Sequence, residues 1–226
     1  MDQLLYLIWK DPQTRRNYTV GTLSKHQGYS FEYCAEAENA EEAGWKGLKA
    51  FPEKKQYNSD VLFPVFSSRL PDRKRRDIKT ILKKYGLDDY DEFDLLKKSG
   101  ARLPIDTYEL IDPIFPEDTT IERKFFIMGT RHHALCDGKK CEAFSSVRIG
   151  ESLILEHELE NEHDPNAIRI STNAGEPLGY VPRYYSEAVS TRLRAGVTYT
   201  CTVIEANKEK RCEECIRVQL NMPKIE

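Results

Sequence analysis

Apolar residues at the start of the chain follow the pattern of β-strands. Residues 4–9 form a continuous apolar run, which is typical of a strand buried on both faces. Residues 17–24 and 29–34 are rich in aromatic and β-branched side chains, and Gly28 separates them. The pattern therefore predicts that the first half opens with a meander of strands.

Helical periodicity replaces the strand pattern further along the first half. Pro71 suits the first position of a helix, Ile78 and Leu82 recur on one helical face, and Gly86 supplies the C-terminal stop. Glycine also follows the other two helix-like segments. We therefore expect an α+β first half with helices over residues 36–43, 71–85 and 91–99.

The second half reads mostly as short strands separated by turn residues. One helix interrupts them, over residues 184–194, and Gly196 follows it. Such a pattern favours a small, partly open barrel of the oligonucleotide-binding type. The five expected strands are residues 125–130, 152–157, 167–171, 197–204 and 216–221.

The two patterns meet in a stretch that is rich in proline. Pro104, Pro113 and Pro116 disfavour both helix interiors and central strands, so residues 103–124 read as extended chain with one short strand at 107–111. This arrangement predicts an α+β module at 1–110, a linker at 111–124 and a mainly-β barrel with one helix at 125–226.

Composition narrows the class of protein. With 34 basic and 37 acidic side chains, the chain is not uniformly basic, so any nucleic-acid binding must use a local patch. Aromatic residues make up 10% of the chain, which excludes an acidic disordered chain. Apolar runs are too short for a membrane span, and the first residues lack a basic signal-peptide region. Six cysteines are few for this length, so we expect a cytoplasmic protein with reduced thiols or a metal site.

A basic run in the first half is one candidate site. The candidate patch can bind phosphates or an acidic partner, but the same pattern describes a solvated helix face. No aromatic residues alternate with these charges, which weakens the case for nucleic acid at this place. The patch consists of Arg69, Arg73, Lys74 and Arg76.

Two cysteine pairs are a second candidate site. Each pair lies at a probable hairpin turn, and four thiolates can hold a structural zinc if the two turns meet. His132 and His133 offer further nitrogen ligands, whereas Cys34 and Cys201 lie in strands and read as buried apolar residues. Ordinary charged turns explain the same spacing, so both interpretations remain open and no cofactor is required. The four candidate ligands are Cys136, Cys141, Cys212 and Cys215.

No catalytic motif emerges from the sequence. His157 and His163 lie six residues apart, whereas the zinc-protease helix needs two histidines four apart. The chain also lacks a nucleophile elbow, a phosphate-binding loop and a dinucleotide fingerprint. We therefore expect a protein that is not an enzyme.

Three motifs in the second half carry a family resemblance. They are the glycine-led segment 129–133, the acidic segment 156–168 that ends in Asn-Ala-Ile, and the Gly-Tyr-Val-Pro step within 178–183. In this order and spacing, residues 125–222 resemble the HIRAN domain. The resemblance implies an OB-like barrel and, as in eukaryotic fork-remodelling ATPases, capture of the free 3′ end of single-stranded DNA.

The resemblance also implies roles for individual residues. Arg131 and His132 match an arginine and a base-stacking tyrosine, while His163 and Asp164 match a second tyrosine and the aspartate that accepts the 3′ hydroxyl. Both tyrosines are histidines here, and imidazole offers less stacking area. Alternatively, the polar residues only hold a turn. The full set of candidate DNA-binding residues is Arg131, His132, His163, Asp164, Asn166, Tyr180 and Arg183.

The first half resembles the N-terminal subdomain of HipA-type toxin kinases. Motifs at 20–23, 31–33, 62–64, 70–76 and 93–101 carry the likeness, which covers roughly residues 5–105. In that family the subdomain is an accessory piece near the antitoxin, and no kinase core is present here. The resemblance implies a docking or regulatory role. Two functions follow: DNA binding through the HIRAN barrel or, alternatively, protein interaction with a kinase or antitoxin partner in trans.

Overall fold

The structure is a computed structural model that describes residues 3–115, 120–133, 147–207, 209 and 214–223. It divides into two compact units, residues 1–113 and 114–226. Among the described residues, no helix is long and apolar enough to cross a membrane.

The first unit is built on one antiparallel sheet of five strands. The order across the sheet is β4-β3-β2-β1-β5, so the apolar β1 lies between two neighbours, as its sequence predicts. A short β5 closes the other edge, and this strand was expected within the proline-rich stretch. The strands are β1 (Gln3–Lys10), β2 (Asn17–Lys25), β3 (Tyr29–Tyr33), β4 (Tyr57–Ser59) and β5 (Tyr108–Ile111).

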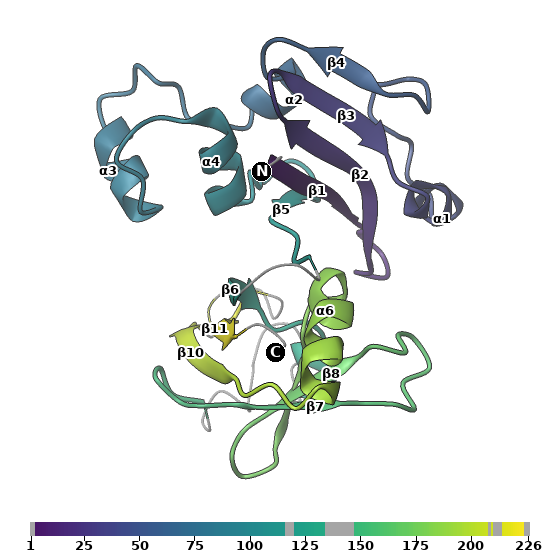
Figure 1. The fold of residues 1–226 in the computed structure, drawn as a ribbon, viewed down its shortest axis with the longest axis vertical. Coiled ribbons are helices and arrows are strands. Elements are labelled where there is room, and N and C mark those ends of the chain that lie inside the picture. The colour runs from purple at the N-terminus through teal and green to yellow at the C-terminus, as the bar shows by residue number, and fades with distance from the viewer. Residues whose placement is uncertain (1–2, 116–119, 134–146, 208, 210–213, 224–226) are drawn as a thin grey trace. The chain divides into compact units, whose positions relative to one another are not determined.

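The described part of the first unit also contains four helices. Figure 1 shows α1 next to β2 and α4 near the end of the sheet that carries β5. Asp91 caps α4 by accepting a hydrogen bond from the Asp94 N–H at 2.9 Å, and Gly100 ends this helix with a φ of 70°. The helices are α1 (Glu36–Glu42), α2 (Pro64–Ser67), α3 (Ile78–Lys84) and α4 (Glu92–Ser99).

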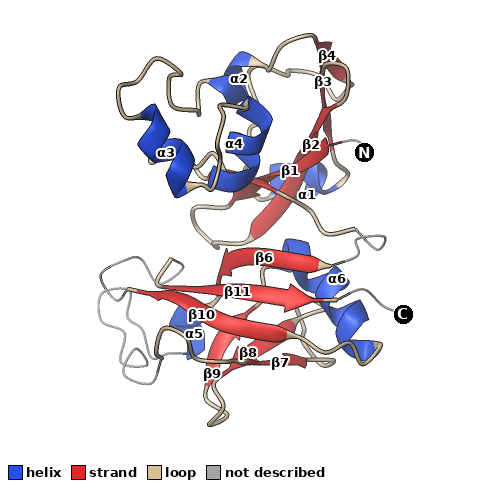
Figure 2. Ribbon diagram, turned by 60° about the vertical axis from the view of Figure 1, so that its left-hand side comes forward, coloured by secondary structure: helices blue, strands red, loops and turns tan. Residues whose placement is uncertain are grey.

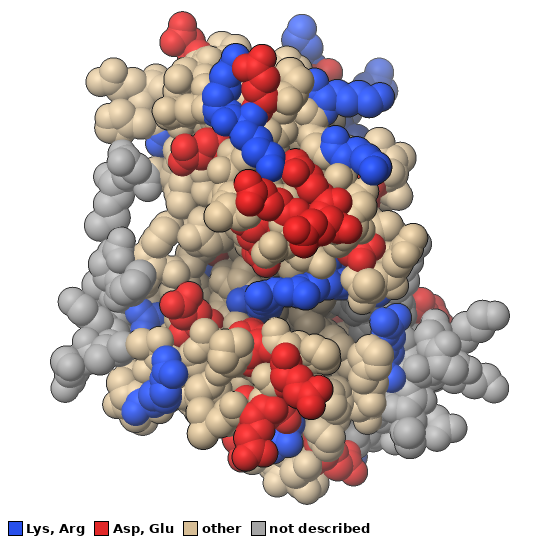
Figure 3. Space-filling model, turned by 90° about the vertical axis from the view of Figure 1, so that its right-hand side faces the viewer, with Lys and Arg blue, Asp and Glu red and all other residues tan. Residues whose placement is uncertain are grey.

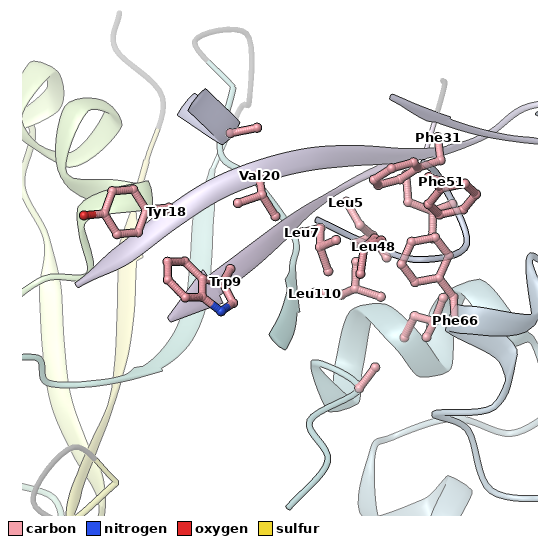
Figure 4. Packing of buried hydrophobic residues seen from close by; sticks show 14 of the residues in the cluster. Leu5, Leu7, Trp9, Tyr18, Val20, Phe31, Leu48, Phe51, Phe66 and Leu110 are labelled. Atoms are coloured by element: carbon pink, nitrogen blue, oxygen red, sulfur yellow. The ribbon is translucent and has the colours of Figure 1, made fainter. Parts of the chain in front are cut away.

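Aromatic rings fill the core between the sheet and the helices (Figure 4). The ring of Phe31 stacks on Phe51 with centroids 4.3 Å apart, and Phe66 from α2 lies 5.6 Å from Phe31. All three rings are buried, together with Leu5 and Leu7 of β1. The first unit therefore has a core of its own.

Helix α3 is shorter than the sequence predicts. The expected helix over 71–85 begins only at Ile78, because residues 71–77 form turns instead. The Asp72 carboxylate accepts a hydrogen bond from the Lys74 N–H at 2.7 Å, which offers the backbone an alternative to the helix. The prediction was right about the end of the helix and wrong about its start.

The second unit is a small barrel made of two three-stranded sheets (Figure 2). The sheets have the orders β10-β11-β6 and β7-β8-β9. Two bridges, Met128 with Tyr180 and Ser152 with Thr202, connect one sheet to the other. The strands are β6 (Ile121–Phe126), β7 (Ile154–His157), β8 (Ile168–Ser171), β9 (Pro177–Tyr180), β10 (Thr200–Ala206) and β11 (Ile216–Met222).

Gly179 makes one of these connections possible. The Met128 N–H donates to the Tyr180 carbonyl at 2.9 Å, and the Tyr180 N–H donates back at 2.8 Å. Gly179 has a φ of 141°, and a Cβ at this position would lie 2.3 Å from the Met128 carbonyl oxygen. Only glycine allows the two backbones to approach this closely, which explains the Gly-Tyr step of the third motif.

The structure confirms the predicted class, an α+β module followed by a mainly-β barrel, and corrects several details. The strand expected at 125–130 is β6, which ends at Phe126, and residues 130–133 form the short helix α5 (Thr130–His133) instead. The predicted helix is α6 (Arg183–Arg194). Both ends of the predicted linker 111–124 belong to strands, since Ile111 ends β5 and residues 121–124 lie in β6.

Candidate nucleic-acid interface

Helix α5 carries the first candidate residues at the end of the barrel where β9 meets Met128. Arg131 and His132 are exposed, and the Arg131 Nε donates to the His132 Nε2 at 3.0 Å. His133 points the other way and is half-buried, with its ring edge-on to the ring of Tyr180 at 5.2 Å between centroids. This ring contact attaches α5 to β9 and leaves the Arg131–His132 pair open to solvent.

A row of polar side chains crosses the sheet next to α5. The register pairs Glu156 of β7 with Arg169 of β8, and Arg169 with Tyr180 of β9. Arg169 bonds to Glu156 at 2.5 Å and lies 3.7 Å from Glu158, and the Tyr180 hydroxyl donates to the Glu158 carboxylate. The row places a cation and a phenol between two carboxylates.

The surroundings of this row shift the pKa values of its members. Burial lowers the pKa of His133, and the neighbouring His132 adds to the effect. A hydrogen bond from Asn161 lowers the pKa of Glu158. Burial raises the pKa of Tyr180, and its bond to Glu158 raises it further. The row therefore favours a neutral imidazole, an ionised carboxylate and a protonated phenol.

The loop between β7 and β8 holds the second group of candidate residues. The Asn161 side-chain oxygen accepts hydrogen bonds from the N–H groups of His163 and Asp164, both at 3.0 Å. One Asp164 carboxylate oxygen accepts from the Asn166 N–H at 2.9 Å. These side chains fix the turn, as Asn and Asp commonly do, while the ring of His163 stays exposed.

The same loop is tied to α6. The Ser186 hydroxyl donates to the other carboxylate oxygen of Asp164 at 2.7 Å, and the Ser190 hydroxyl donates to the Asn166 side-chain oxygen at 3.1 Å. Ser186 and Ser190 lie one helical turn apart, so they face the loop together. Asp164 and Asn166 thus have scaffolding bonds, although each carboxylate oxygen can accept a further hydrogen bond.

The structure brings several of the predicted residues together through connections that the sequence did not indicate. Arg131 and His132 share α5, Tyr180 lies beside them on β9, and Asp164 and Asn166 bond to α6, which begins with Arg183. No motif pointed to the bonding partners, which come from other elements. The sequence did contain one signal for this row. Acidic side chains alternate along β7 and just after it, a basic side chain lies in β8, and opposite charges at paired strand positions attract each other. The residues that sequence reasoning missed are His133 as a ring partner, Glu156, Glu158, Arg169, Ser186 and Ser190.

One member of the predicted basic patch has a different role. The side chain of Arg69 is 7% exposed, and it forms two hydrogen bonds of 2.7 Å to the Asp106 carboxylate and one to the Ala101 carbonyl. Arg69 is therefore a buried residue that connects the end of α2 to the segment before β5, and its charge is not available at the surface. The remaining members, Arg73, Lys74 and Arg76, are exposed in the turns before α3.

The zinc prediction falls mainly outside the described residues, which exclude Cys136, Cys141 and Cys212. Cys215 is buried at the start of β11. Burial raises the pKa of Cys201 to about 12, in keeping with its predicted role as an apolar core residue. Within the described ranges, no group of three metal-binding side chains is present. Zinc stays a prediction, which metal analysis of the purified protein would test.

Comparisons with known proteins agree with both resemblances. The HIRAN domain profile matches residues 122–221, and the HipA N-terminal domain profile matches residues 15–104. A crystal structure of a protein from Lactobacillus plantarum is 21% identical, covers 46% of this chain and 96% of its own, and has a TM-score of 0.38. The crystal structure of the HIRAN domain of human HLTF is 15% identical, covers 46% of this chain and 76% of its own, and has a TM-score of 0.35. No curated protein matches the chain.

Fold and profiles together define a two-domain chain in which an α+β domain precedes a small β-barrel domain. The first is a HipA N-terminal domain, and the second is a HIRAN domain. A HIRAN domain implies binding to DNA.

Proposed function

We propose that this chain is a non-catalytic, cytoplasmic DNA-binding protein whose HIRAN domain takes up single-stranded 3′ ends. The HipA N-terminal domain serves as a docking or regulatory unit in this proposal. The observation that supports it most directly is the exposed Arg131–His132 pair on α5, which the contact between His133 and Tyr180 holds against β9.

Each side chain offers a suitable interaction with a DNA end. The guanidinium of Arg131 can pair with a phosphate in a bidentate manner. His132 and His163 are exposed imidazoles that can stack on terminal bases, at about 1–3 kcal/mol per base for an aromatic ring. Asp164 retains acceptor capacity for a terminal hydroxyl beside its two intramolecular bonds.

Acidic residues around the loop favour an end over an internal segment. Glu156 lies in β7, and Glu158, Glu160, Glu162 and Asp164 follow in the loop after it. Carboxylates repel internal phosphates, whereas a terminal 3′ hydroxyl carries no charge and can donate a hydrogen bond. This charge pattern supports end binding rather than binding along the backbone.

Fluorescence anisotropy with single-stranded oligonucleotides tests the proposal. The full chain should bind a free 3′ hydroxyl more tightly than a 3′ phosphate. Arg131→Ala should weaken both ligands equally and lower the salt slope by about one unit. Arg148→Ala is the matched control, because Arg148 is an exposed arginine of the same unit outside the interface. Absence of binding to any oligonucleotide at low salt would refute the proposal.

The role of Asp164 needs a second comparison because this residue also holds the loop. Asp164→Ala should reduce the preference for the 3′ hydroxyl. Ser186→Ala removes the same connection to α6 but keeps the carboxylate, so the preference should survive in this variant. Equal loss of preference in the two variants would show that Asp164 acts as scaffolding alone.

The second candidate function is protein interaction with a kinase or antitoxin partner in trans. The HipA N-terminal domain match over residues 15–104 favours it. Salt dependence separates the two functions, since phosphate contacts release counterions and docking through apolar surface does not. A purified HipA-type kinase or its antitoxin, added at constant salt, is the corresponding binding probe.

A further inference from the structure

A basic segment of the first unit remains outside the proposed end-binding site. Residues 73–84 contain seven basic side chains and one acidic side chain, although the whole chain has a net charge of -3. Every one of the seven is exposed. The segment consists of the turns that precede α3 and of α3 itself, and it is called the α3 basic segment below.

Most charges of the α3 basic segment are not neutralised by neighbours. Asp77, the acidic residue of the segment, pairs with Arg75 at 2.9 Å. Within the part of the chain that the structure describes, Arg76, Lys79 and Lys83 have no ion-pair partner. Their charges are therefore available to an anionic partner.

Aromatic rings also lie beside the α3 basic segment: Tyr85 follows Lys84 in the sequence, and folding brings Tyr90 to Arg73. The guanidinium of Arg73 lies over the ring of Tyr90 at 5.5 Å, and the Lys84 ammonium lies over Tyr85 at 5.6 Å. The Tyr90 hydroxyl donates to the Pro71 carbonyl at 2.8 Å and fixes its ring. Both rings are half-buried, and basic groups combined with aromatic rings are typical of surfaces that bind nucleic acid without sequence preference.

Helix α3 gives this segment a defined geometry. Leu82 is buried and anchors the helix, while Lys79 and Lys83 lie four residues apart on an exposed side. Side chains at this spacing are neighbours about 5–6 Å apart between their Cβ atoms. The two lysines therefore form one exposed cationic site on the helix.

Acidic side chains gather on the face of the first unit that carries α1, where Glu36, Glu38, Glu41 and Glu42 lie, and Lys and Arg side chains border them (Figure 3). Lys54 pairs with Glu41 at 2.9 Å and lies 3.7 Å from Glu38, which neutralises part of this acidic charge. The α3 basic segment, most of whose charges are not neutralised by described neighbours, therefore attracts an anionic chain more strongly than the α1 face does.

We propose that the α3 basic segment is a second DNA-binding surface, which contacts the phosphate backbone without reading sequence or ends. It lies on the HipA N-terminal domain and uses none of the residues of the HIRAN interface. Because both surfaces belong to one chain, binding at one raises the effective concentration at the other. The backbone surface would retain the protein on DNA whose 3′ end is not in the barrel.

Closed circular single-stranded DNA separates the two surfaces, since a circle has no end. The full chain should bind the circle, and the double variant Lys79→Ala/Lys83→Ala should bind it about tenfold more weakly with a salt slope lower by about 1.4 units. Alanine favours helix, so α3 remains intact. Lys46→Ala/Lys49→Ala is the matched control, because it removes two exposed lysines of the same unit outside the segment and should change neither value.

Each result decides between the two proposals. Binding of a linear oligonucleotide with a free 3′ hydroxyl, but not of the circle, would overturn the backbone surface and leave end binding intact. If the wild type bound the circle and the linear DNA equally, and the α3 double variant bound neither, the backbone surface would be supported and end binding refuted. Retention of the wild type on polyglutamate but not on the circle would assign the segment to an acidic protein and overturn the proposal.

Discussion

The two units hold their predicted site residues with different kinds of partner. In the first unit, a basic residue that reads as surface, Arg69, is buried against Asp106, while its neighbours along the chain remain exposed. In the second unit, residues that read as ligand contacts, Asp164 and Asn166, bond to two serines of α6. The difference teaches that residue type suggests chemistry, whereas the partner brought near by folding decides the role.

The largest expected effect on stability comes from a substitution at the point where the two sheets of the barrel connect. Gly179→Ala should destabilise the second unit by about 5 kcal/mol, because a Cβ at a φ of 141° would overlap the Met128 carbonyl and break a pair of backbone hydrogen bonds. The first unit has its own core and should keep its unfolding transition. Differential scanning calorimetry of the full chain would resolve the two transitions.

Gly175→Ala provides the control for that experiment. Gly175 also has a positive φ, of 84°, but an added Cβ would meet nothing within 4 Å. Only backbone strain of about 1 kcal/mol is expected there. If the two alanine variants had the same effect, close approach of β9 to Met128 would not be the reason for Gly179.

The second test removes the buried cation of the first unit. Arg69→Ala should cost about 3 kcal/mol, since it leaves the Asp106 carboxylate without its main partner. Arg76→Ala, a few residues further on and exposed, should change stability by less than about 0.5 kcal/mol. Urea unfolding followed by tryptophan fluorescence measures both, because Trp9 and Trp45 lie in the first unit.

The sequence predicts the strands well wherever the signal is local. The apolar run of β1 and the alternation in β2, β10 and β11 give the strands to within a few residues. Strand β9 was missed because it has four residues, includes Gly179 and depends on a bridge to Met128 far along the chain. Long-range pairing of this kind leaves no local pattern.

The candidate site shows the same limit. Motif resemblance indicated Arg131, His132 and Asp164 as candidates, since these residues lie within short segments. The clamp between Arg69 and Asp106 spans 37 residues, and the bond between Asp164 and Ser186 spans 22. Neither pair has a spacing that periodicity can detect, so only the fold reveals that the residues hold structure together.

A smaller effect should come from the connection between the loop and α6. Ser186→Ala should cost about 1 kcal/mol in the second unit, because it removes one hydrogen bond to a carboxylate that keeps its other partner. Ser99→Ala, which removes a bond to the Leu95 carbonyl within α4, is the matched serine change in the first unit. If Ser186→Ala lowered the calorimetric transition of the first unit, or Ser99→Ala that of the second, the two units would not unfold separately.

The smallest expected effect is a change in the stability of the second unit with pH, which distinguishes the two units without a substitution. Burial keeps the pKa of His133 below its ordinary value of 6.5, so the unfolded chain binds a proton at this residue before the folded chain does. Stability of the second unit should therefore fall as the pH decreases through about 6.5 and level off below the folded pKa. Two charged side chains face the His133 ring: Glu158 favours the protonated form of His133, and Arg169 disfavours it.

The first unit should respond only at much lower pH and serves as the internal control. Burial raises the pKa of Asp106, but bonds from Arg69 and the Tyr108 N–H outweigh this and leave it below its ordinary value of 3.8. Its contribution is lost only as the pH falls below that value. Urea unfolding between about pH 7.5 and 5.5 should therefore shift the second transition alone. His133→Phe keeps a ring on Tyr180 and removes the titration, so a shift of the same size in this variant would show that another group is responsible.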